Sequence, residues 1–142
     1  METPVIKREI GPGGDVVLRD ARCAFRFSAS PGVLEIGIEG VDRGQFGAAA
    51  LDEIARALVR ERPLELFIDA STASMPAVDV SRQWTRFFAL NQKDLKRVSV
   101  LVSSKSVELT VAIAQHLSQT GKLIQIYSDR EVFESRKPQP RR

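Results

Sequence analysis

Every second position is apolar in two neighbouring stretches of the first half of the chain, residues 23–29 and 33–39. This period of two predicts half-buried strands. The Ser-Pro-Gly sequence between them predicts a tight turn, so the two strands should form a hairpin. Residues 15–18 predict a short strand before the hairpin. Residues 1–14, which end in Gly-Pro-Gly-Gly, predict a flexible leader.

From residue 46 onward, segments with helical spacing of apolar residues alternate with short continuous apolar runs. The helical spacing predicts four helices. The continuous runs predict strands that are covered on both faces, as in a parallel sheet. The predicted helices occupy residues 46–62, 77–92, 107–120 and 129–135, and the predicted strands occupy residues 64–68, 98–102 and 123–127.

This order of elements predicts one α/β domain at residues 15–135. Its sheet should be mixed, with four or five strands, entered by the hairpin and flanked by helices. We expect Leu66, Ile68, Val100 and Val102 to be buried in it. Residues 136–142 should form a disordered basic tail.

Composition and charge exclude several classes of function. The chain has 142 residues, of which 43% are apolar and 27% charged, which is typical of a globular domain. The net charge is +3, but the last seven residues carry four positive charges, so the rest of the chain has a net charge of −1. A nucleic-acid-binding domain usually carries its basic stripe on the fold itself, and we therefore expect no nucleic-acid partner.

The sequence also argues against a membrane, secreted or metal-binding protein. No apolar stretch reaches the roughly 18 residues of a membrane-spanning helix, and the N-terminus lacks the pattern of a signal peptide. Cys23 is the only cysteine and His116 the only histidine. A lone cysteine fits a reducing, cytoplasmic location, and we expect no metal site and no cofactor.

Residues 64–80 hold the most informative pattern in the chain. An apolar run ends at Asp69 and is followed by the hydroxyl residues Ser71, Thr72 and Ser74, then by Pro76 and a predicted helix. In open α/β sheets, ligands and partners bind at the carboxyl ends of the strands. A site is therefore expected here.

Three stretches make the chain resemble the STAS domain, the domain of anti-sigma factor antagonists and sulfate transporters, and its shorter STAS/SEC14-like bacterial relatives. They are LFID at residues 66–69, RVSVLVSS at 97–104 and KLIQIYSDREVF at 122–133, and the similarity spans residues 25–135. The resemblance implies a STAS-like fold and a regulatory, protein-binding function.

In antagonists of that family, the strand ends in an acid, two serines and a glycine, and a partner kinase phosphorylates the second serine. The matching run here is Asp69-Ala70-Ser71-Thr72. Asp69 and Ser71 fit the pattern, whereas Ala70 replaces the first serine and Thr72 the glycine. Two interpretations follow: a phosphorylation or anion site at Asp69, Ser71, Thr72 and Ser74, or side chains that only cap the next helix.

A second hydroxyl-rich segment, Ser103, Ser104 and Ser106, follows the neighbouring predicted strand. The two segments should lie side by side at the sheet edge. They would form a small polar or anion pocket or two independent helix caps, with Ser104 or Ser106 capping the third helix.

No catalytic arrangement is visible, so we expect the protein not to be an enzyme. His116 falls near the end of a helix that begins at the sheet edge, which places it roughly 15 Å from Ser104 at 1.5 Å per residue. No G-x-S-x-G nucleophile elbow is present.

The expected function is therefore a STAS-like module that binds a partner protein through residues 69–76 and the following helix. On that helix, Trp84 would be an aromatic anchor with Arg82 and Arg86 as a charged rim. Packing of Trp84 on the sheet is the other interpretation, and a homodimer is also open. The alternative function is a SEC14-like carrier of a small ligand or lipid, with a pocket under the second and third helices.

Overall fold

The computed structural model describes residues 6–74, 76–117 and 122–138. It contains a seven-stranded mixed sheet in the order β1-β2-β3-β4-β5-β6-β7, with β1 to β4 antiparallel and β4 to β7 parallel. The strands are β1 (Lys7–Ile10), β2 (Val16–Arg19), β3 (Cys23–Ser30), β4 (Val33–Gly40), β5 (Leu64–Ala73), β6 (Leu95–Leu101) and β7 (Ile124–Tyr127). The helices are α1 (Ala49–Arg60), α2 (Val78–Asn91), α3 (Lys105–Leu117) and α4 (Arg130–Ser135), with a 3-10 turn at Gln92–Asp94.

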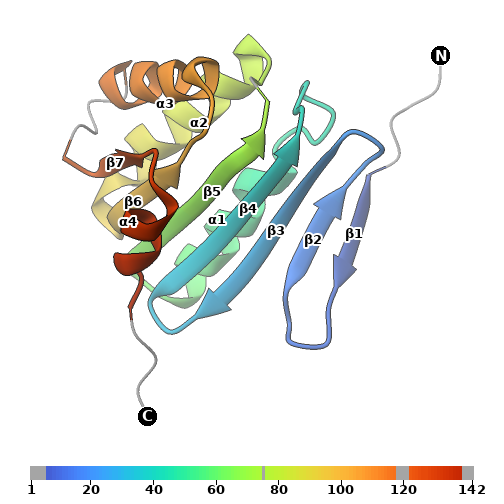
Figure 1. The fold of residues 1–142 in the computed structure, drawn as a ribbon. Helices are drawn as coiled ribbons and strands as arrows, with labels where there is room; N and C mark the ends of the chain where they lie inside the picture. The colour runs from blue at the N-terminus through green and yellow to red at the C-terminus, as the bar shows by residue number, and fades with distance from the viewer. Residues whose placement is uncertain (1–5, 75, 118–121, 139–142) are drawn as a thin grey trace.

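The two faces of the sheet are covered unequally. Helices α1, α2 and α3 pack on one face, where the main apolar core lies. The short helix α4 covers the opposite face over the parallel strands, as Figure 1 shows in red. In the described part of the chain, no helix is long and apolar enough to cross a membrane.

The central strand β5 carries both cores because its side chains alternate between the faces. Leu66 and Ile68 lie in the main core, whereas Phe67 lies in the small core under α4. The four residues expected to be buried, Leu66, Ile68, Val100 and Val102, are each at most 4% exposed. The predicted α/β architecture is confirmed.

The sheet has seven strands rather than the four or five expected. The main omission is β1, which lies within the expected flexible leader and pairs with β2 from Lys7 to Ile10. All four of its residues are exposed. An edge strand with both faces in water needs no apolar alternation, so the pattern of hydrophobic residues could not indicate it.

The expected disordered tail is also partly wrong. Lys137 is mostly covered, with its ammonium 2.7 Å from Glu35 and 2.9 Å from Glu134. It also lies over the ring of Phe133, 5.1 Å from the centroid. These contacts fix the start of the tail to the fold, while residues 139–142 lie outside the described residues.

Ser99 is the one side chain in the described part of the chain whose buried polar atom has no hydrogen-bond partner. It is fully buried on β6, and an unsatisfied buried hydroxyl costs about 1–3 kcal/mol. We therefore expect Ser99→Ala to raise the free energy of unfolding by about 1 kcal/mol, measured by urea denaturation. Ser28→Ala, at a partly exposed position of β3, is the control and should change it by less than about 0.5 kcal/mol. A loss of stability in Ser99→Ala would contradict the prediction.

Candidate functional site

The candidate site lies on the α4 face of the sheet. Asp69 and Ser71 follow Phe67 at alternate positions of β5, so their side chains leave the strand on the same side as the Phe67 ring. Phe67 packs edge-to-face on Phe133 of α4, with 5.9 Å between ring centroids. This contact places the N-terminus of α4, and with it Arg130, beside the polar end of β5.

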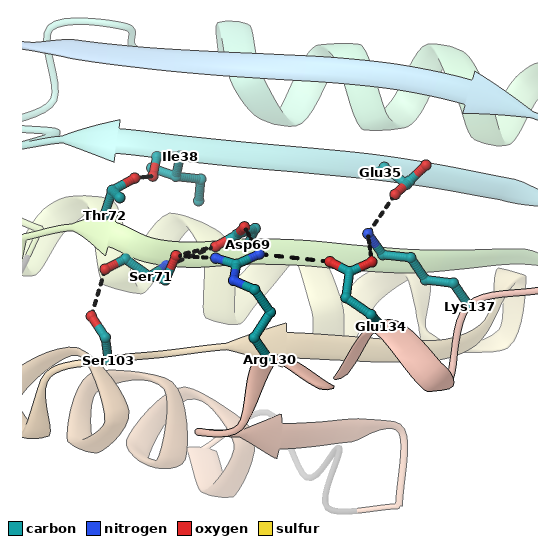
Figure 2. A network of polar contacts seen from close by, with 9 residues as sticks. All are labelled: Glu35, Ile38, Asp69, Ser71, Thr72, Ser103, Arg130, Glu134 and Lys137. Carbon is teal, nitrogen blue, oxygen red and sulfur yellow. Dashed lines mark hydrogen bonds and ion pairs between the residues drawn. The ribbon is translucent and has the colours of Figure 1, made fainter. Parts of the chain in front are cut away.

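Arg130 joins Asp69 and Ser71 into one network (Figure 2). Its guanidinium donates to Asp69 Oδ2 at 3.0 Å and to Ser71 Oγ at 2.8 Å. The other oxygen of Asp69, Oδ1, accepts hydrogen bonds from the Ser71 hydroxyl and from the Ser71 backbone N–H at 3.0 Å. The Ser71 hydroxyl is thus held between an acid and a cation, and its side chain is half-buried.

The same face carries a second set of charges that holds α4. Arg130 lies 3.6 Å from Glu134, and Lys137 bridges Glu134 to Glu35 of β4. Individually, such exposed pairs contribute little. Together, the connected ion pairs link α4 and the residue Lys137 after it to strands β4 and β5.

Burial alone would raise the pKa of the Asp69 carboxyl, but the opposing contacts prevail. Hydrogen bonds from the Ser71 hydroxyl and N–H, together with the hydrogen bond and charge of Arg130, hold the pKa below its ordinary value of 3.8. A lowered pKa in the folded state stabilises the fold above the ordinary value. That contribution is lost as the pH falls through the folded-state pKa.

We expect Arg130→Met to raise the pKa of Asp69, because it removes both a donor and a positive charge. A carboxyl ¹³C NMR titration of Asp69 measures this directly. Arg136→Met is the matched control, since it removes one positive charge at the C-terminal end of α4. Equal pKa values for Asp69 in the wild type and in Arg130→Met would contradict the assigned network.

The two hydroxyl-rich segments do lie side by side. Ser103 Oγ donates to the backbone carbonyl of Ser71 across the end of the sheet. Ser104 Oγ accepts from the Val107 N–H at 3.1 Å, so the predicted cap of α3 is confirmed. Ser106 is exposed, and its carbonyl accepts from the Thr110 hydroxyl.

The prediction that Asp69, Ser71, Thr72 or Ser74 caps α2 is wrong. The N-cap residue of α2 is Ala77, and no side chain caps it. Strand β5 instead continues to Ala73, beyond the predicted end of the strand at residue 68, because β4 offers partners up to Gly40 across a register shift. Thr72 Oγ1 donates to the Ile38 carbonyl at 3.1 Å, and Ser74 N–H donates to the Gly40 carbonyl at 2.9 Å.

Trp84, Arg82 and Arg86 are not brought to this network. Helix α2 covers the opposite face of the sheet, where Trp84 is partly buried, stacked near Phe25 and tilted against Phe88. Arg82 and Arg86 are exposed on α2. The end of β5 and the polar side of α2 are therefore two separate surfaces.

Arg130 is the main site residue that the sequence did not indicate. It follows Asp129, which was correctly expected to begin the last helix and accepts from the N–H groups of Glu131 and Val132. In a parallel sheet, the helix after β7 begins at the same edge where β5 and β6 end. The first residues of that helix were therefore detectable candidates.

The remaining reactive side chains lie outside the site. His116 is exposed in the last turn of α3. Cys23 is buried, and burial together with nearby Asp42 and Asp20 raises the pKa of its thiol to about 12. Among the described residues, no three His, Cys, Asp or Glu side chains are grouped as metal ligands would be.

A cavity of about 110 Å³ lies between the sheet and helices α2 and α3. Its wall is almost entirely apolar and includes Ile68 and Val100 from the sheet, Val80 and Trp84 from α2, and Val111 from α3. It is on the opposite face of the sheet from the Asp69–Ser71–Arg130 network.

Comparison with known proteins identifies the fold. An anti-sigma factor antagonist from Mycobacterium paratuberculosis matches with a TM-score of 0.57 and 14% identity, over 80% of this chain and 92% of that chain. An uncharacterised DUF3478-family protein with a SpoIIAA-like fold from Shewanella loihica PV-4 matches with a TM-score of 0.56 and 15% identity, over the same shares. No protein-family model and no curated protein matches the sequence. The chain has a STAS-like fold, the fold of an anti-sigma factor antagonist.

Proposed function

We propose that this protein is a non-enzymatic regulatory module that binds a partner protein at the surface around Asp69, Ser71, Ser103 and Arg130. The observation that carries the proposal is the double contact of Arg130 with Asp69 and Ser71. It holds a hydroxyl in a fixed position at a partly exposed strand end. The likeness of the fold to an anti-sigma factor antagonist supports a regulatory function of this kind.

Ser71 is the proposed point of regulation. A phosphate on its oxygen would add about −1.5 to −2 charges beside the Asp69 carboxylate and remove the hydroxyl proton that Asp69 now accepts. Arg130 would then be drawn from Asp69 to the phosphate, because guanidinium–phosphate pairs are strong and bidentate. Phosphorylation would change both the charge and the shape of the surface offered to a partner.

The test compares capture of proteins from cells of the natural host by tagged wild type, Ser71→Asp and Arg130→Met. Quantitative mass spectrometry should find a protein whose capture falls at least about tenfold in both variants, as for loss of a buried charged contact. Ser106→Ala, an exposed serine on α3, should not reduce it. The proposal fails if capture depends on Arg86→Glu on α2 and is unchanged by Ser71→Asp and Arg130→Met.

The same cultures test the modification. Mass spectrometry of the protein purified from its host should find phosphate on Ser71. If partner capture depends on Ser71 and Arg130 but no phosphate is found under any growth condition, the binding surface stands and the proposed regulation does not.

The cavity under α2 and α3 favours a second candidate function, the carrier of a small ligand. A pocket in this place was expected for a SEC14-like carrier, but about 110 Å³ is less than the roughly 150 Å³ of a cavity that holds one benzene molecule. This cavity volume supports binding of a ligand of a few heavy atoms and not of a complete lipid.

A further inference from the structure

The cavity between the sheet and helices α2 and α3 contains one feature that its apolar wall does not explain. Asp42, in the loop between β4 and α1, contributes to its lining. The Asp42 residue is only 8% exposed. Ser99 Oγ is the one fully buried polar side-chain atom without a partner among the described residues, so an Asp42 oxygen without a partner keeps some accessible surface. An ionised carboxylate oxygen of this kind can accept a hydrogen bond from a molecule that enters the cavity.

Only one oxygen of Asp42 has a partner. Oδ1 accepts from the Gly44 N–H at 2.9 Å, and no described residue donates to Oδ2. The ionisable groups that interact electrostatically with its carboxyl are Asp20 and the Cys23 thiol. Neither supplies a positive charge, and burial raises the pKa of Asp42.

We propose that this cavity binds a short aliphatic molecule with a hydrogen-bond donor, an alcohol or an amine, at one end. The chain would pack among Ile68, Val100 and Val111, and the hydroxyl or ammonium group would donate to Asp42 Oδ2. The proposal rests on the second candidate function and names its ligand class.

The size and charge of the site set the selectivity. By comparison with cavities of about 150 Å³ that hold the six carbons of benzene, there is room for about four or five heavy atoms. A carboxylic acid of the same length would place its negative charge beside Asp42, where like charges repel strongly at low dielectric. The site should therefore reject fatty acids, in contrast to a general apolar pocket.

Titrations with 1-butylamine, 1-butanol and butyrate test this in the intact protein. Methyl NMR signals of Ile68, Val100 and Val111 should shift saturably with butylamine and butanol, and butyrate should bind at least about tenfold more weakly. Trp84, the only tryptophan, also lines the cavity, so its fluorescence should change in parallel. Absence of saturable shifts, or butyrate binding as tightly as butylamine, would overturn the proposal.

Two variants test separately whether the Asp42 charge sets the preference among the probes and whether the probes bind in the cavity. Asp42→Asn keeps an oxygen for the Gly44 N–H but removes the charge, so the preference for butylamine over butyrate should fall to less than about threefold. Val111→Phe should fill the cavity and weaken all three probes, whereas Val78→Phe, at an exposed position of α2 outside it, should not. Unchanged preference in Asp42→Asn, or unchanged binding in a folded Val111→Phe, would refute the site. These probes do not involve the Ser71 surface, so their failure leaves the partner-binding proposal unaffected.

Discussion

Phe133→Ala is expected to lower the free energy of unfolding by about 3–5 kcal/mol, the usual cost of removing a fully buried phenylalanine. Phe133 has no exposed surface and is the centre of the small core under α4. Its ring lies edge-to-face on Phe67 at 5.9 Å and on Tyr127 at 6.1 Å. With only six residues, α4 is too short to be stable without this packing.

The same substitution should also disturb the candidate site. Since Arg130 is positioned by α4, loosening the helix should weaken its contact with Asp69 and raise the pKa of that carboxyl. Urea denaturation and the Asp69 titration measure the two effects on the same protein. Val132→Ala is the matched control, because Val132 precedes Phe133 but is 40% exposed; it should cost less than about 0.5 kcal/mol. A loss below 1 kcal/mol in Phe133→Ala, or the same loss in both variants, would show that α4 is not held by this ring.

The parallel half of the fold was predictable because its strands are apolar on both faces. Leu66, Ile68 and Val100 fill the main core, while Phe67 faces the small one. Apolar strands of this kind, alternating along the chain with amphipathic helices, are compatible with few sheet topologies. The antiparallel edge was less predictable, because β1 has only exposed residues and depends on pairing with β2.

The candidate site was predictable as a location but not as a network. Asp69, Ser71 and Ser103 follow strands whose ends meet at one edge, and the structure brings them together. Arg130 is 61 positions from Asp69, and no local pattern pairs residues at that separation. Their contact depends on the packing of Phe133 on Phe67, which fixes α4 on the opposite face from α2.

The structure separates the Asp69–Ser71–Arg130 network from Trp84 for a related reason. The sequence places α2 directly after β5, which suggests one continuous surface. The alternation of side chains along β5 separates them, because Asp69 and Ser71 point to the α4 face while the connection to α2 leads to the other. A difference of one residue along a strand is enough to change which face a side chain occupies, and element ends are the least certain part of any sequence-based prediction.

Gly40→Ala is expected to lower the free energy of unfolding by about 2–5 kcal/mol, from a strained backbone and a steric overlap together. Gly40 has a φ of +82°, in the left-handed region that favours glycine. A Cβ there would overlap the carbonyl oxygen of Arg22 and lie 3.2 Å from Cα of Cys23. That carbonyl also accepts from the Val41 N–H, so moving it away from the new methyl group would break a hydrogen bond at the open end of the hairpin, between the residue before β3 and the residue after β4.

Gly47→Ala separates the two contributions. Gly47 also has a positive φ, +56°, but a Cβ there would meet nothing within 4 Å, so only the backbone cost of about 1–2 kcal/mol applies. Urea denaturation of both variants should therefore show a larger loss of unfolding free energy for Gly40→Ala. Equal losses would show that the Arg22 carbonyl can move freely.

The position of Gly40 matters for the candidate site, because the Gly40 carbonyl accepts from the Ser74 N–H and so supports the end of β5 just beyond Ser71. A shift of this backbone should therefore also change the Asp69 titration, whereas Gly47→Ala should leave it unaltered.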